Sequence, residues 1–129
     1  MPDDLRRSTS PVFFDLYRIK FPVTAIVSIG HRVSGVLLAM CVPVLVYVLQ
    51  LSLSGSDGYA RAGALFQHDA IGAATVVLIW ALAHHVLAGV RHLLFDIHVG
   101  TALRAARISA WIVLAVELAV VILAIRVIL

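Results

Sequence analysis

The chain has 129 residues, of which 62% are hydrophobic and only 13% are charged. Soluble domains are about 45 to 50% apolar and about 25% charged, so this composition excludes an ordinary soluble domain and indicates a membrane protein. The formal net charge is +3, but the basic residues are spread along the chain rather than gathered in one patch, which argues against nucleic-acid binding.

Residues 1–23 are predicted to form a cytoplasmic N-terminal segment. They mix charged residues with short apolar patches, so they lack the continuous apolar core of a secretory signal. The stretch RIKFP at residues 18–22 is typical of an entry into the membrane interface.

Three apolar stretches follow, each long enough for the roughly 20-residue helix that crosses a bilayer. We expect these helices at about residues 24–51, 69–95 and 108–129, so that the chain is a single all-α membrane-anchor domain. Pro43 predicts a kink in the first helix. The polar, turn-rich residues 52–68 are expected to form a loop, and Cys41, as the single cysteine, excludes an intrachain disulfide.

The basic residues predict the orientation. Eight of the ten lie at or near one membrane side in an arrangement of three helices: Arg6, Arg7, Arg18, Lys20, Arg32, Arg91, Arg104 and Arg107. Positive charge is retained in the cytoplasm, so the N-terminus and the link between the second and third helices are predicted to be cytoplasmic, and the C-terminus is predicted to lie outside.

Polar side chains gather on narrow faces of the first two helices. At about 100° per residue, one arc of about 100° on the first helix holds Thr24, Ser28, His31, Arg32 and Gly35. On the second helix, one face holds His85, Gly89, His92 and Asp96, and another holds His84, Ala88 and Arg91. Ionisable residues within a membrane usually face a protein interior, a cavity or a cofactor, so both helices are expected to have partners on these faces.

His85 is the principal candidate for a cofactor ligand. It lies eleven residues before Asp96, about 16 Å along a helix, which is roughly the bilayer midplane. A buried haem fits this pattern, and a simple hydrogen bond between helices is the alternative. Two histidines of one straight helix cannot both ligate one iron from opposite faces, so the second ligand must come from elsewhere. His31 either supplies it or pairs with Arg32 to hold the haem propionates.

The remaining polar residues are assigned simpler roles. His84 is expected to pack or to form a hydrogen bond, and His68 and His98 are expected to be solvated. Arg91, His92 and Asp96 are interpreted as interfacial anchors, and His92 and Asp96 alternatively as members of a proton or electrostatic network. Glu117 lies deep in the third helix, and no basic residue of this chain is evidently within reach, so we expect it either to be protonated or to be bonded to a neighbouring subunit. Gly35 and Gly89 are expected to allow close packing of helices.

The stretches SIGHRVSG (residues 28–35) and HVLAGVRHLLFD (residues 85–96) resemble two signature stretches of the cytochrome b556 subunits of succinate dehydrogenase. The upstream DLYRIKFPVTAI is also similar to that family. The resemblance covers nearly the whole chain in length, in number of spans and in motif position, although the third helix adds little to it.

The resemblance implies a membrane-anchor subunit of succinate:quinone oxidoreductase in the bacterial inner membrane. The partners would be a second membrane-anchor subunit, an iron-sulfur subunit and a flavoprotein subunit, with FAD and the iron-sulfur clusters only in these partners. His85 would be the axial haem b ligand from this chain, with the other ligand in the sister subunit. Ser28 and Arg32 would bind ubiquinone, and His31 with Arg32 would face the propionates. This chain would not itself oxidise succinate.

Two other classes of function remain. A small transporter or channel subunit could use the His, Arg and Asp stripe as a path for protons or metal ions. A purely structural anchor would leave His85 and Arg32 unexplained.

Overall fold

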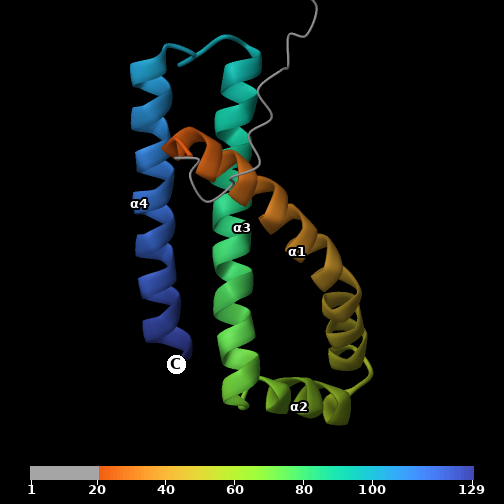
Figure 1. Cartoon of the computed structure of the whole chain (residues 1–129). Coiled ribbons are helices and arrows are strands. Elements are labelled where there is room, and N and C mark those ends of the chain that lie inside the picture. Colours follow the sequence, from red (N-terminus) through yellow and green to blue (C-terminus); the bar gives the residue numbers. More distant parts are fainter. Residues whose placement is uncertain (1–20) are drawn as a thin grey trace, which may run out of the picture.

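The structure is a computed structural model that describes residues 21–129, and every regular element in this range is a helix (Figure 1). The elements are α1 (Val23–Ser52), α2 (Ser56–Leu65), α3 (Asp69–Asp96) and α4 (Leu103–Ile128). α1, α3 and α4 are long and apolar enough to cross a membrane. The predicted all-α membrane fold with three spanning helices is confirmed. The predictions for residues 1–20 lie outside the described residues, and the orientation remains a prediction.

α1 is longer than a perpendicular crossing requires. Its 30 residues extend about 45 Å at 1.5 Å per residue, which exceeds the roughly 30 Å hydrocarbon core, and such a helix tilts or bends. α1 is inclined to α3 and changes direction along its length (Figure 1). Pro43 lies within it and cannot donate a backbone hydrogen bond, which agrees with the predicted kink.

Two expectations about helix positions were wrong. The segment expected to be a loop contains the helix α2. Gly55, the residue before α2, has a positive φ of 106°. Asp57 lies in the first turn of α2, where a negative charge interacts favourably with the helix dipole. The polar composition of this segment, which predicted a loop, is therefore compatible with a short helix. α4 begins at Leu103, five residues before the apolar run, because Arg104 and Arg107 are good helix formers despite their charge.

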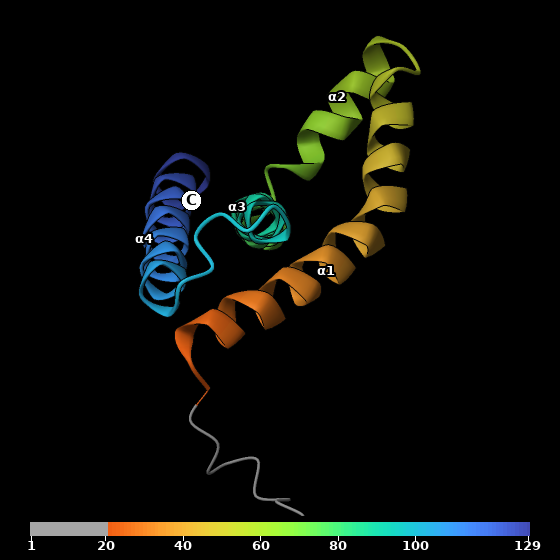
Figure 2. The ribbon, with the colours of Figure 1, turned by 90° about the horizontal axis from the view of Figure 1, so that it is seen from above.

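α3 and α4 lie side by side and run in opposite directions, and α1 crosses them near the end of α3 and the start of α4 (Figures 1 and 2). The core at this crossing consists of Val27, Ala88, Ala110 and Val113. Two of these four residues are alanines, and small residues let helix backbones approach closely in a membrane. This crossing also brings together the polar faces predicted for the first two spanning helices.

α1 and α3 diverge toward α2, which joins their far ends (Figures 1 and 2). A cavity of about 290 Å³ lies in this wedge, between Cys41 and Val48 of α1 and Ile71 and Leu78 of α3. In the most apolar 18-residue stretch of α1, only 6% of the residues are buried. Most of α1 is therefore available to lipid or to another protein.

Candidate functional site

His85 is half-buried on the side of α3 that faces α1. Its Nδ1 atom lies 3.2 Å from the backbone oxygen of His31 and 3.3 Å from Ser34 Oγ. The Ser34 hydroxyl donates to the same oxygen at 2.9 Å. Because a carbonyl oxygen only accepts, Nδ1 of His85 is assigned the hydrogen and Nε2 keeps its lone pair. Nε2 makes no hydrogen bond within residues 21–129.

Three imidazole rings form a stack between α1 and α3. The ring of His31 lies between the other two, with centroids 4.2 Å from His85 and 5.0 Å from His92, at interplanar angles of 12° and 25°. We call His31, His85 and His92 the imidazole stack. Gly35 and Gly89 make room for it: a Cβ atom at position 35 would lie 3.0 Å from His85 Cε1, and one at position 89 would lie 3.3 Å from His31 Nε2. The two glycines therefore allow close packing as expected, and what packs against them is the imidazole rings of His85 and His31.

Ser28 joins one end of the stack. Its Oγ lies 3.4 Å from His92 Nε2, and His92 Nδ1 lies 2.6 Å from the carbonyl oxygen of Ala88. Nδ1 must therefore donate to Ala88, and in the neutral ring Nε2 accepts from the Ser28 hydroxyl. Arg32 lies one turn after Ser28 and is exposed, without a hydrogen bond or ion pair to any of residues 21–129. A hydroxyl and an exposed guanidinium thus occupy the same region of α1.

This donor set fits a haem iron ligand. Histidines that bind metal usually donate their other ring N–H to a carbonyl or carboxylate, which fixes the tautomer and the ring orientation. His85 has this arrangement, with Nδ1 held by the carbonyl of His31 and Nε2 left as the available ligand atom. No group of three or more His, Cys, Asp or Glu side chains in the described part of the chain is placed to hold a bare metal ion. The exposed Arg32 guanidinium suits a carboxylate such as a haem propionate.

His84 has a different environment from its neighbour. It is only 2% exposed, its Nδ1 is hydrogen-bonded to Glu117 of α4, and its Nε2 lies 3.1 Å from the backbone oxygen of Val27 in α1. The expected hydrogen-bonding role of His84 is confirmed. Glu117 therefore has a partner within this chain, the histidine His84, and not only in a neighbouring subunit as one of the two expectations had it.

The His84 ring lies in a notch formed by Gly30 of α1. A Cβ atom at position 30 would be 2.5 Å from His84 Nε2, and the ring cannot move aside without losing its bonds to α1 and α4. We expect Gly30→Ala to lower stability by about 1–3 kcal/mol, as overpacking does, measured as a lower melting temperature in detergent. Gly63→Ala in α2 is the matched control, since nothing lies within 4 Å of its added Cβ. An equal effect of both changes would contradict this packing.

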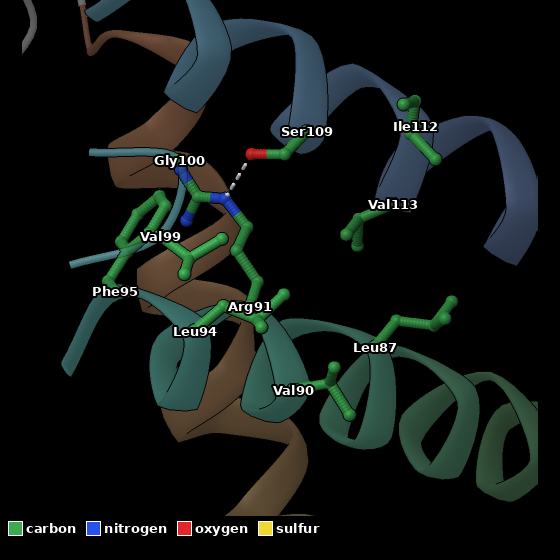
Figure 3. Close-up of a pocket in the computed structure, with 10 residues that line it drawn as sticks. All are labelled: Leu87, Val90, Arg91, Leu94, Phe95, Val99, Gly100, Ser109, Ile112 and Val113. Atoms are coloured by element: carbon green, nitrogen blue, oxygen red, sulfur yellow. Dashed lines mark hydrogen bonds between the residues drawn. The ribbon is translucent and has the colours of Figure 1, made fainter. Parts of the chain in front are cut away.

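Arg91 is buried between α3 and α4 rather than extended to the membrane interface. It is 5% exposed, its Nε donates to Ser109 Oγ and its Nη2 donates to the carbonyl oxygen of Ala106, both at 3.0 Å. Its guanidinium carbon lies 4.4 Å from the centroid of the Phe95 ring. The guanidinium and the Ser109 hydroxyl form the polar end of a mainly apolar pocket between α3, the following link and α4 (Figure 3). Arg91 therefore connects α3 and α4, and its interpretation as an interfacial anchor is wrong.

The structure brings His31 and His85 into contact and places Ser28 beside His92, which itself stacks on His31. Arg32 is exposed and makes no hydrogen bond or ion pair with the other described residues. Asp96 is exposed at the end of α3 and makes no hydrogen bond to the other described residues, and His68 and His98 are exposed as expected.

Sequence reasoning missed Ser34, the second partner of His85 Nδ1. Its position is three residues after His31 on the same helix, and that spacing is the signal that could have identified it.

Comparison with known proteins yields a consistent set of relatives. The family model described as "Succinate dehydrogenase/Fumarate reductase transmembrane subunit" matches residues 6–124. A succinate dehydrogenase cytochrome b556 subunit of Coxiella burnetii is 35% identical over 115 residues, covering 88% of this chain and 92% of the relative. The subunit of the same name in Rickettsia typhi is 33% identical over 108 residues (84% of this chain and 82% of the relative), and that of Paracoccus denitrificans is 27% identical over 107 residues (83% and 82%).

Proposed function

The chain belongs to the family of succinate dehydrogenase/fumarate reductase transmembrane subunits, and from this premise we propose that it is the cytochrome b membrane anchor of a succinate:quinone oxidoreductase. In this role it binds haem b together with a sister membrane subunit and forms part of the ubiquinone-reduction site. It does not carry the succinate-oxidising site, which belongs to a flavoprotein partner.

The main observation in support of the proposal is the hydrogen bonding of the His85 ring. Its Nδ1 is anchored on the carbonyl of His31, so its Nε2 is oriented as an iron ligand by a bond within the same chain. His31 and Arg32 would hold the propionates, and the sister subunit would supply the second iron ligand. The haem iron, when bound, accepts and donates single electrons.

Ser28 and Arg32 bind the quinone. A quinone carbonyl gains negative charge as it is reduced, and a hydroxyl donor and a cation placed beside it stabilise that charge. The Ser28 hydroxyl faces His92 at 3.4 Å, so it can turn from that imidazole to a quinone oxygen. The Arg32 guanidinium is exposed, which suits it to donate to such a ligand.

The exposed surface of α1 suits the predicted partners. An 18-residue stretch with 6% of its residues buried leaves a broad apolar face for the sister membrane subunit. The predicted cytoplasmic end, where Ser28 and Arg32 lie, faces the iron-sulfur subunit that delivers electrons. The complex resides in the bacterial inner membrane.

The test is purification of the intact complex from membranes through a tag on this chain. We expect three co-purifying subunits and the absorption bands of a b-type haem in the reduced-minus-oxidised spectrum. Succinate should reduce added ubiquinone in the same preparation. A preparation without b-type bands would contradict the haem assignment and favour the transporter or channel hypothesis, in which the polar stripe conducts ions.

A further inference from the structure

Two consecutive histidines of α3 bind α1 one helical turn apart. His84 Nε2 lies 3.1 Å from the carbonyl oxygen of Val27, and His85 Nδ1 lies 3.2 Å from the carbonyl oxygen of His31. These two oxygens are four residues apart on α1. The rotation of α3 about its own axis therefore determines both contacts together.

Only His84 continues to the third spanning helix. Its other nitrogen is hydrogen-bonded to Glu117 of α4, and the side chains of His84 and Glu117 are 3% and 12% exposed. The ring thus joins α1, α3 and α4 at one level of the bundle. Arg91 also joins α3 to α4, two turns further along, through Ser109 and Ala106, but it makes no hydrogen bond to a described residue of α1.

The hydrogen-bond chemistry defines where the protons are. The carbonyl oxygen of Val27 only accepts, so Nε2 of His84 carries a hydrogen. One further proton lies between Nδ1 and Glu117, either on the ring with an ionised carboxylate or on a neutral carboxyl group. The pair has no net charge in either case, which avoids the cost of an isolated charge in a membrane.

We propose that His84 and Glu117 are positioning residues that hold α3 in the rotation at which the neighbouring His85 presents Nε2 to the haem. This inference rests on the proposed function. Productive ligand geometry must be held within about 0.5 Å and 10–20° by residues that are themselves locked in place. His84 meets this condition because both ring nitrogens are hydrogen-bonded and the ring packs directly against Gly30.

Two substitutions of Glu117 test whether its hydrogen bond to His84, rather than its charge or its packing, positions the helix. They are Glu117→Leu and Glu117→Gln. The amide of glutamine can donate to Nδ1 of the neutral His84 ring, so Glu117→Gln keeps the bond without a carboxylate, whereas leucine removes it. We expect Glu117→Leu to lower haem affinity about tenfold or more, the lower end of the range for groups that orient metal ligands. It should also shift the haem absorption maximum and the low-spin electron paramagnetic resonance signals, and Glu117→Gln should leave all three near wild type.

Thr75→Val is the matched control, since Thr75 lies on α3 but its hydroxyl donates only to Ile71 of the same helix. All variants are measured in the purified complex, with succinate-driven reduction of an artificial dye reporting assembly. If the complex with Glu117→Leu does not assemble, the double variant with His84→Phe and Glu117→Leu is used in its place. Removing both polar partners avoids leaving one buried polar group unpaired. This double variant should assemble and still show the shifted haem signals.

Normal haem signals in Glu117→Leu, or in the assembled double variant, would overturn the proposal, as would equal effects of leucine and glutamine at position 117. A wild-type complex without haem would instead contradict the proposed function. The two failures are therefore distinguishable.

Discussion

Replacing His85 by leucine is expected to remove haem b from the assembled complex. Leucine has a similar volume but no nitrogen, so the iron loses its ligand from this chain while the apolar contacts of α3 remain. Loss of a group that only orients a metal ligand costs about 10- to 100-fold in affinity, so loss of the ligand itself should cost at least as much. The measurement is the reduced-minus-oxidised spectrum of purified complex, normalised to the dye-reduction activity of the soluble partners.

His68→Leu is the matched control for this change. His68 is exposed at the start of α3, so its replacement should leave the b-type bands at wild-type intensity. Retention of full haem content in His85→Leu would remove the assignment of His85 as ligand. His31, which stacks on it, would then be the next histidine to test.

Replacing Arg32 by leucine should reduce the rate of ubiquinone reduction about 100-fold, the effect expected when one preorganised group that stabilises developing negative charge is lost. Dye reduction by the soluble partners should stay near wild type, because Arg32 is exposed and makes no hydrogen bond or ion pair with residues 21–129. Arg32→Lys should fall between the two, since lysine keeps the charge but not the planar fork of donors. Both activities are assayed in the same membranes with succinate as donor.

Arg126→Leu provides the control for loss of a positive charge. Arg126 lies in the last turn of α4, at the opposite end of the bundle from Arg32, and its replacement should not alter ubiquinone reduction. Equal losses of quinone and dye reduction in Arg32→Leu would assign Arg32 to assembly rather than to the quinone site.

The sequence predicted the spanning helices and their polar faces because both depend on local patterns. An apolar run long enough to cross a bilayer must be helical, since its backbone groups have no other partners. The spacing of His84, Ala88 and Arg91 placed them on one face, and all three are buried in the structure. The spacing of His85 and His92 placed them on a second face, and both contact α1.

What the sequence could not supply was which helix each face meets. The partner of Glu117 lies 33 residues away on α3, and pairing over that distance depends on how α3 and α4 are aligned. Ser34 is similar, because its hydroxyl becomes significant only when α1 brings it to His85, 51 residues away. α2 was missed for a different reason: it is short and polar, so neither length nor apolar periodicity identifies it.

The contacts between α3 and the other spanning helices are unequal along its length. The side chains of α3 that form hydrogen bonds to α1 and α4 all lie in the segment from His84 to His92. The N-terminal half of α3, next to α2, faces α1 across an apolar cavity. When the protein enters a thinner or thicker bilayer, the less constrained ends of α1 and α3 can change their separation and tilt. The hydrogen-bonded end then keeps its geometry, so we expect the distances between the rings of the imidazole stack to change little with bilayer thickness.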